Sequence, residues 1–130
     1  MFENNTFAHL ENGDVRGSNF GPGLMHAVYL RDGSSRNVVR GNDMRHISGD
    51  PVRVSNAAND NVIEKNRSHD AGQSVFVSEF YNDSNPTAPQ RDSTGTRIAG
   101  NQIGTLYGQT KKARPFGEKV SHKPPPALKV

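Results

Sequence analysis

Side chains that can transfer protons or bind a carboxylate recur in this chain at a spacing of 24 residues. His26 precedes Asp50 by 24 positions, and Tyr29 precedes Arg53 by the same number. Imidazole and phenol groups act as general acids and bases, and a guanidinium group binds a carboxylate through two parallel hydrogen bonds. If the fold brings these four residues together, they predict acid–base chemistry on a negatively charged substrate.

Ser74 follows Asp50 at the same spacing, so that His26, Asp50 and Ser74 suggest a nucleophilic triad. Strands that stack in this order would place Asp50 in the middle and keep His26 and Ser74 about 10 Å apart. A triad needs the histidine between the other two groups, within hydrogen-bond reach of both. The order of the residues therefore excludes a triad.

His9, His46 and Asp70 form a second set of residues in register. Stacked strands would place them about 5 Å apart, and zinc accepts imidazole and carboxylate ligands. Side chains of stacked strands project in parallel, however, and do not converge on one point. We therefore expect no metal site and no cofactor.

The spacing of 24 belongs to a repeat that runs through the chain. Short β-branched segments alternate with Gly, Asn and Asp, and a second element repeats in step with the first; the segments are 26–30, 50–54 and 74–78, and 37–42, 61–66 and 96–101. A regular period of this size is typical of solenoids, in which each repeat is one coil.

Within a coil, successive side chains of a strand point to opposite faces. This alternation predicts inward columns of Val28, Val52 and Phe76 and of Val39, Ile63 and Ile98. It predicts outward columns of Tyr29, Arg53 and Val77 and of Arg31, Ser55 and Glu79. Asn42, Asn66 and Asn101 fit an asparagine ladder at a turn, where Asn also tolerates a left-handed backbone.

The repeat predicts a β-helix of about four coils over residues 1–107, followed by a basic, proline-containing tail over 108–130. Two inserted loops interrupt the period, at about 11–23 and 79–95. Loops that rise beside one face of a solenoid form a groove, and long loops are where function tends to lie. Tyr81 belongs to the second loop.

Composition limits the function classes. The chain has 130 residues, of which 32% are hydrophobic, and no cysteine. It is long enough for one domain with a narrow core, and it contains no apolar run of the roughly 20 residues that a membrane span needs. Residues 1–107 hold 10 basic and 12 acidic residues, so we expect neither nucleic acid nor membrane as a partner.

The Asn-x-Val/Ile-x-x-Asn element, followed by a second β-branched strand, resembles the right-handed parallel β-helix proteins of the pectin-lyase-like group. The resemblance covers about residues 2–107. It implies an all-β, right-handed parallel β-helix solenoid. The group includes polysaccharide lyases, hydrolases, uronate epimerases and phage or surface proteins, so the resemblance favours a carbohydrate-active protein with an acidic polysaccharide as its partner.

Elimination or inversion at C5 of a uronate needs a cation for the carboxylate, a base and an acid. We assign the catalytic roles to Arg53 as the cation and to His26 or Tyr29 as the proton carrier, with Asp50 orienting His26. The substrate-binding residues would be Arg31, Glu79 and Tyr81. Such substrates lie outside the cell, although no segment of this chain reads as a signal peptide.

The alternative is a non-catalytic structural or adhesion module, such as part of a phage fibre or a surface protein. An open solenoid end exposes apolar side chains and unpaired backbone groups, and it needs a cap. The first coil begins within five residues of Met1 without a capping helix. The expectation is therefore a fragment of a larger β-helix or a protomer that packs its end on another chain.

Overall fold

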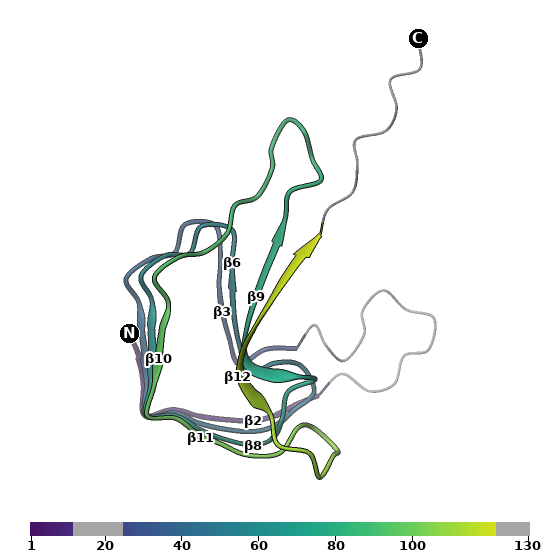
Figure 1. Cartoon of the computed structure of the whole chain (residues 1–130). Helices are drawn as coiled ribbons and strands as arrows, with labels where there is room; N and C mark the ends of the chain where they lie inside the picture. Colours follow the sequence, from purple (N-terminus) through teal and green to yellow (C-terminus); the bar gives the residue numbers. More distant parts are fainter. Residues whose placement is uncertain (12–24, 122–130) are drawn as a thin grey trace.

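A computed structural model describes residues 1–11 and 25–121, and these residues form three parallel sheets of four strands each (Figure 1). Sheet A contains β1 (Phe2–Glu3), β4 (Val38–Arg40), β7 (Val62–Glu64) and β10 (Arg97–Ala99). Sheet B contains β2 (Thr6–Leu10), β5 (Asp43–Ile47), β8 (Arg67–Ala71) and β11 (Gln102–Ile103). Sheet C contains β3 (Val28–Leu30), β6 (Val52–Ser55), β9 (Val75–Asn82) and β12 (Arg114–Ser121).

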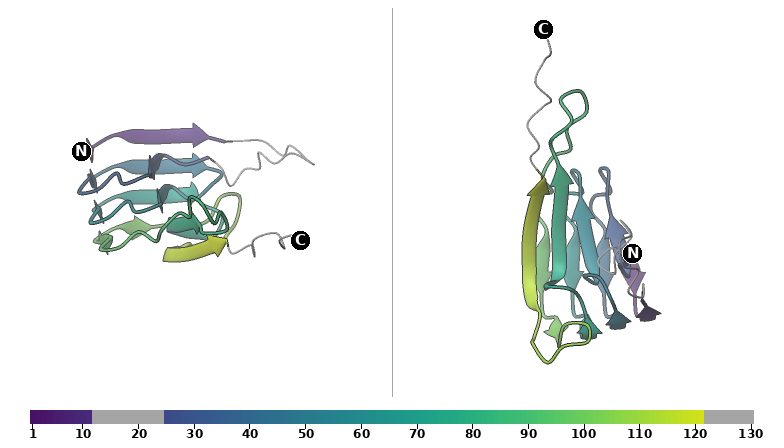
Figure 2. Two further views of the ribbon diagram at one scale, coloured as in Figure 1. Left: turned by 90° about the horizontal axis from the view of Figure 1, so that it is seen from above. Right: turned by 90° about the vertical axis from the view of Figure 1, so that its right-hand side faces the viewer.

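The chain visits the three sheets in the order A, B, C and then repeats the circuit. Each strand pairs in parallel with the strand of the next circuit, so that four coils stack along one axis (Figure 2). This arrangement confirms the prediction of an all-β fold with four coils, and it is consistent with a parallel β-helix solenoid.

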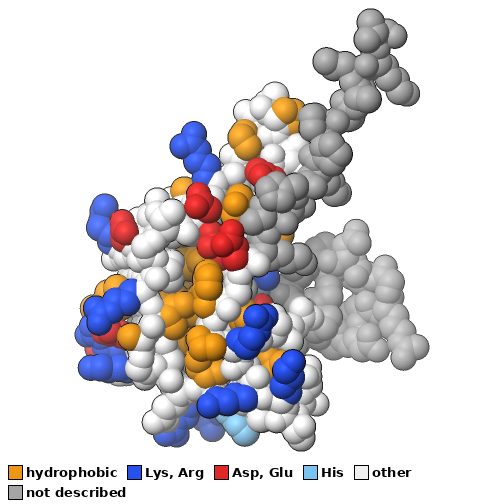
Figure 3. Space-filling model, in the orientation of Figure 1, with side chains coloured by type: hydrophobic (Ala, Val, Ile, Leu, Met, Phe, Trp, Pro, Cys, Tyr) orange, Lys and Arg blue, Asp and Glu red, His pale blue; other side chains and the backbone are white. Residues whose placement is uncertain are grey.

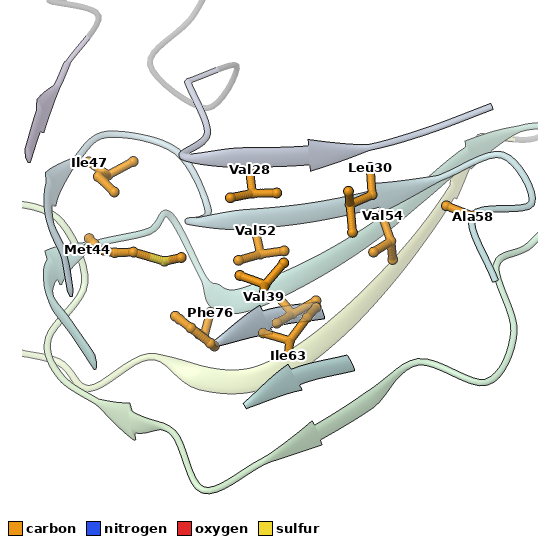
Figure 4. Packing of buried hydrophobic residues seen from close by; sticks show 12 residues of the cluster. Val28, Leu30, Val39, Met44, Ile47, Val52, Val54, Ala58, Ile63 and Phe76 are labelled. Atoms are coloured by element: carbon orange, nitrogen blue, oxygen red, sulfur yellow. The ribbon is translucent and has the colours of Figure 1, made fainter. Parts of the chain in front are cut away.

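The core is a narrow column of side chains between the three sheets. Figure 4 shows valine side chains from sheets A and C meeting in the middle, with Met44 and Phe76 at one corner. Twelve buried residues form this cluster: Val28, Leu30, Val39, Met44, Ile47, Val52, Val54, Ala58, Ile63, Ala71, Phe76 and Val77. Most of them are β-branched, which suits a pleated surface.

An asparagine ladder forms the corner between sheets A and B. The side-chain oxygen of Asn42 accepts hydrogen bonds from the backbone N–H and the side-chain amide of Asn5. Asn66 does the same for Asn42, and Asn101 for Asn66. The second amide hydrogen reaches a carbonyl of the preceding coil, as from Asn66 to Val39. The predicted ladder is confirmed, and it satisfies polar groups that the core would otherwise leave unpaired.

The register of sheet C differs from the prediction by one residue in the third coil. Val28 pairs with Val52, as expected, but Val52 pairs with Val77 and not with Phe76. Phe76 and Val77 are both fully buried in the core. Accommodating Phe76 as an extra residue moves the rest of β9 by one position, so that Arg53 pairs with Ser78 and Val54 with Glu79.

The stack of coils extends beyond residue 107, where the sequence placed the start of the tail. Strand β12 pairs with β9 and completes the fourth coil. The second predicted loop begins four residues later than expected, because β9 continues to Asn82, and it then projects from the coil stack (Figure 1). Apart from Glu11, the first predicted loop lies outside the described residues, as does the end of the chain from residue 122.

No helix is present in the described residues, and hence no apolar helix of a length that would cross a bilayer.

Replacing Asn66 with Ala tests the contribution of the ladder. The change removes two hydrogen bonds accepted by the side chain and two donated by it, in a fully buried position. We expect the free energy of unfolding to fall by about 3 kcal/mol, measured by urea denaturation followed by circular dichroism. Asn5→Ala, at the exposed end of the ladder, should cost less than about 1 kcal/mol. Equal losses for the two variants would contradict this role of the ladder.

Candidate functional site

The outer face of sheet C carries a column of one residue from each coil: Tyr29, Arg53, Ser78 and Gly117, the last of which has no side chain. Tyr29 is 42% exposed, and Arg53 is half-buried. The structure thus brings Tyr29 and Arg53 together, as the sequence predicted. Ser78 takes the place expected for Val77, and its hydroxyl makes the column more polar.

Two contacts hold the Arg53 side chain in place. Its Nε donates a hydrogen bond to Ser78 Oγ at 3.1 Å, and its guanidinium carbon lies 5.6 Å from the centre of the Phe80 ring. The second contact is a cation–π interaction. Because the Nε is engaged, the terminal amino groups are the part of the fork that can bind a ligand.

A pocket of about 280 Å³ opens beside Arg53. Arg114 and Glu118 of β12 also line this pocket, together with Asp50, Gln73, Ser74, Val75, Ser78 and Gly117. Arg114 was missed by sequence reasoning, because the tail was not assigned to a coil. The segment Arg114–Ser121 has the length of a strand, but its apolar and polar residues do not alternate, so the sequence offered little signal for Arg114. Its exposed guanidinium gives the pocket a second cationic group.

His26 lies at the start of the same face and is half-buried. Its Nδ1 is hydrogen-bonded to the backbone carbonyl of Asp50, and its ring centre is 5.5 Å from that of Tyr29. Burial lowers the pKa of His26 below its ordinary value, and the charge of Arg53 acts in the same direction, against the hydrogen bond to the Asp50 carbonyl. The imidazole is therefore neutral near pH 7, with Nδ1 carrying the proton and Nε2 able to accept one.

Arg31 contacts Tyr29 and Asp32. Its guanidinium carbon lies 5.5 Å from the centre of the Tyr29 ring, and its Nε is 2.9 Å from Asp32 Oδ2. Both Arg31 and Asp32 are exposed, so this ion pair is weak. Arg31 therefore lies beside the column, as predicted, with one carboxylate already bound.

The Asp50 carboxylate has a different environment from the one predicted. Its Oδ1 accepts hydrogen bonds from the backbone N–H groups of Gln73, Ser74 and Val75, at 3.0, 3.1 and 3.2 Å. The side chain is 6% exposed, and the contact to His26 comes from the Asp50 carbonyl instead of its carboxylate. Asp50 thus fixes the turn that leads into β9, and it orients His26 only through its backbone.

Glu79 does not lie on the outer face of sheet C. The one-residue shift of β9 pairs it with Val54, whose column faces the core, and its side chain is 4% exposed. Its carboxylate accepts a hydrogen bond from the backbone N–H of Ser93. Burial raises the pKa of Glu79, and the charges of Glu118 and Asp92 raise it further, against the bond from Ser93. The sequence predicted that Glu79 binds substrate on the outer face beside Arg53. Because of the shift, its side chain faces the core instead.

Tyr81 belongs to the same strand as Glu79 and lies within reach of the same acidic groups. Burial raises the pKa of its phenol, and the charges of Glu118, Asp92, Asp83 and Glu79 act in the same direction. The structure therefore divides the predicted site into two parts. His26, Tyr29, Arg31, Asp50 and Arg53 lie around the outer face of sheet C, whereas Glu79 and Tyr81 lie among carboxylates near the fourth coil.

The histidines of sheet B stack as the sequence predicted. The rings of His9 and His46 are 4.7 Å apart and nearly parallel, and His46 Nδ1 lies 2.7 Å from Asp70 Oδ2. His9, His46 and Asp70 all have positive φ, between 50° and 58°, so they mark a repeated bend of the three strands. Within residues 1–11 and 25–121, no three His, Asp or Glu side chains are arranged to hold a metal ion.

Asp50→Ala tests the structural role of this carboxylate. The change leaves three backbone N–H groups without their acceptor, and we expect the free energy of unfolding to fall by about 3 kcal/mol. Ser74→Ala, which changes an exposed side chain of the same turn, should stay within about 0.5 kcal/mol of the parent. Urea denaturation measures both, and an Asp50→Ala variant of unchanged stability would refute the assignment.

Glu79→Gln tests the buried carboxylate through pH. The raised pKa means that the folded state holds the proton more tightly than the unfolded state, so the charge of Glu79 destabilises the fold as pH rises through 4.5. Glutamine keeps an acceptor for Ser93 without the charge. We expect the variant to be more stable than the parent at pH 7, with a smaller difference at about pH 4. Urea denaturation at both pH values checks this, and a variant that is less stable at pH 7 would contradict it.

Comparison of this chain with protein-family models, with curated proteins and with solved structures finds no match.

Proposed function

We propose that this protein binds an acidic polysaccharide along the outer face of sheet C. The observation that carries the proposal is the fixed guanidinium of Arg53, between the exposed Tyr29 and a pocket that Arg114 also lines. A uronate carboxylate matches a guanidinium group in charge and geometry, and an exposed tyrosine ring offers a flat surface and a hydroxyl to the sugar. The action of such a protein would lie outside the cell.

A second proposal concerns the fold. We propose that the solenoid is right-handed and of the pectin-lyase-like kind. The support is that the chain connects parallel strands of one sheet through crossovers, and such crossovers are right-handed in about 98% of cases. The repeated Asn-x-Val/Ile-x-x-Asn element is the part of the sequence that resembles this group.

The neutral imidazole of His26 supports a reaction at the same place. In the proposed step, His26 Nε2 takes the C5 proton of a uronate whose carboxylate binds Arg53. The electron pair of the C–H bond either forms a C4–C5 double bond with loss of the O4 leaving group, or receives a proton on the opposite face. The first outcome is a lyase and the second an epimerase, and the Tyr29 hydroxyl is the nearby acid.

A non-catalytic structural or adhesion module is the second candidate. It is favoured by the apolar side chains that the last coil leaves exposed, among them Phe116 at 40% exposure. In that case the coils serve to present a surface and to associate with other chains.

The binding proposal is tested by calorimetric titration of the folded protein with polygalacturonate. We expect binding that weakens with added salt and a loss of at least about tenfold in affinity for Arg53→Ala, because a charge-assisted hydrogen bond contributes about 1.5–3 kcal/mol. Arg53→Lys should recover only part of the loss, since an ammonium group cannot reproduce the fork.

Arg97→Ala provides the matched control, because Arg97 is an exposed arginine on sheet A. Equal weakening by Arg97→Ala and Arg53→Ala would indicate attraction by overall charge and would refute the site. Proton NMR of the same mixtures tests the reaction. Unsaturated uronate signals would indicate a lyase, a changed ratio of C5 epimers an epimerase, and an unchanged polymer with intact binding would reject the catalytic step alone.

A further inference from the structure

The coil stack has two different ends. We call the edge formed by β1, β2 and β3 the head end and the edge formed by β10, β11 and β12 the tail end. In each sheet these strands are the outermost ones among the described residues, so one side of their backbone has no strand partner. An unpaired parallel edge is a template for another strand.

Apolar side chains end most of the inward columns at both ends, the exception being the column that ends in Glu118. Figure 3 shows the tail end, where hydrophobic side chains are exposed in the centre of the face and acidic groups lie beside them. Phe2 at the head end is 39% exposed and Phe116 at the tail end is 40% exposed. The register places the head residues Phe2 and Phe7 in the same columns as the tail residues Ile98 and Ile103.

The asparagine ladder is complementary at its two ends. In every step of the ladder, the side-chain oxygen of one coil accepts from the backbone N–H and side-chain amide of the coil before it. At the head end, no described group donates to Asn5 Oδ1. At the tail end, no described group accepts from the Asn101 backbone N–H. One end thus presents the acceptor and the other the donor of a further ladder step.

We propose that the tail end of one molecule binds the head end of a second copy, so that the coils continue across the interface. Strands β10, β11 and β12 would pair in parallel with β1, β2 and β3 of the second copy. Ile98 would then stack on the second Phe2, and the Asn101 N–H would bond to the second Asn5 Oδ1. The contact uses neither Tyr29 nor Arg53, although β12, which takes part in it, also lines the pocket beside Arg53.

A second copy is the partner that fits best, because three separate features match in one register. The sheets continue in parallel, the apolar columns continue without a polar interruption at Phe2 and Phe7, and the ladder gains one more step. An unrelated apolar partner would meet the exposed side chains but would have no reason to supply the asparagine acceptor at that position.

One group at the tail end opposes this contact. Glu118 continues the inward column of Leu30, Val54 and Glu79, and with Glu79 it lines a hollow of about 450 Å³ that Phe116 and Ile98 also line. Leu30 of the second copy would lie against this carboxylate. Burying a charge against an apolar side chain costs free energy and weakens the contact. We therefore expect weak association in the parent chain and stronger association when the charge is removed.

The symmetry of the contact determines the assembly. Because the head and tail ends are different surfaces, their contact is heterologous, and it leaves a free head and a free tail after each addition. The expected products are open chains of increasing length and not a closed two-fold dimer.

Sedimentation velocity of the purified 130-residue chain at increasing concentration tests the proposal. Phe2→Lys blocks the head end and Phe116→Lys blocks the tail end, in both cases at exposed side chains. Each variant alone should remain monomeric, whereas an equimolar mixture should form a one-to-one dimer and nothing larger. Ala88→Lys adds the same charge in the exposed loop after β9 and should associate like the parent. Circular dichroism verifies the fold of every variant.

Glu118→Gln gives a readout in the opposite direction. Removal of the charge should lower the concentration needed for association at least about tenfold, since one tenfold change corresponds to about 1.4 kcal/mol. Four outcomes would overturn the proposal: a parent and a Glu118→Gln variant that are both monomeric at all concentrations, a closed dimer, association of either blocked variant alone, or a mixture of the blocked variants that does not form a dimer.

Discussion

Parallel pairing of equivalent residues from coil to coil is the constraint on which the rest of this structure depends. It stacks the asparagines of four coils so that each side chain satisfies the backbone of its neighbour, and it stacks valines and isoleucines into a core only one column wide. A thin core offers little apolar area per residue. The buried amide ladder stabilises the coils in addition to this core, because every unmet hydrogen bond in it would be costly.

The same constraint makes register decisive for function. One extra residue around Phe76 moves Ser78 into the Arg53 column and Glu79 into the column that faces the core. The shift provides Arg53 with a hydroxyl partner and removes a carboxylate that would have neutralised it. It also moves Glu79, together with its β12 partner Glu118, into the column that faces the core. A cationic outer face and an acidic hollow near the tail end are thus two consequences of a single displacement.

The two surfaces differ in what they can bind. The outer face of sheet C is polar, with a guanidinium held by Ser78 and Phe80 and an exposed tyrosine beside it, which suits an anionic sugar. The tail end is apolar with a carboxylate near its edge, which suits another coil. The two surfaces meet at β12, because Glu118 lines both the pocket beside Arg53 and the hollow at the tail end.

The sequence by itself determined the period, the four coils, the asparagine ladder and the pairing of Tyr29 with Arg53, since these follow from the 24-residue repeat and from the alternation of side chains along a strand. Tertiary structure decided which residues are neighbours where the coils depart from the regular repeat. The position of Glu79 depends on how the core accommodates both Phe76 and Val77. The three backbone partners of the Asp50 carboxylate depend on the path of a turn, and the place of Arg114 on which strand β12 pairs with. A local pattern contains none of this information. Side chains alternate every two residues in any strand, whichever strand it pairs with and in whichever register.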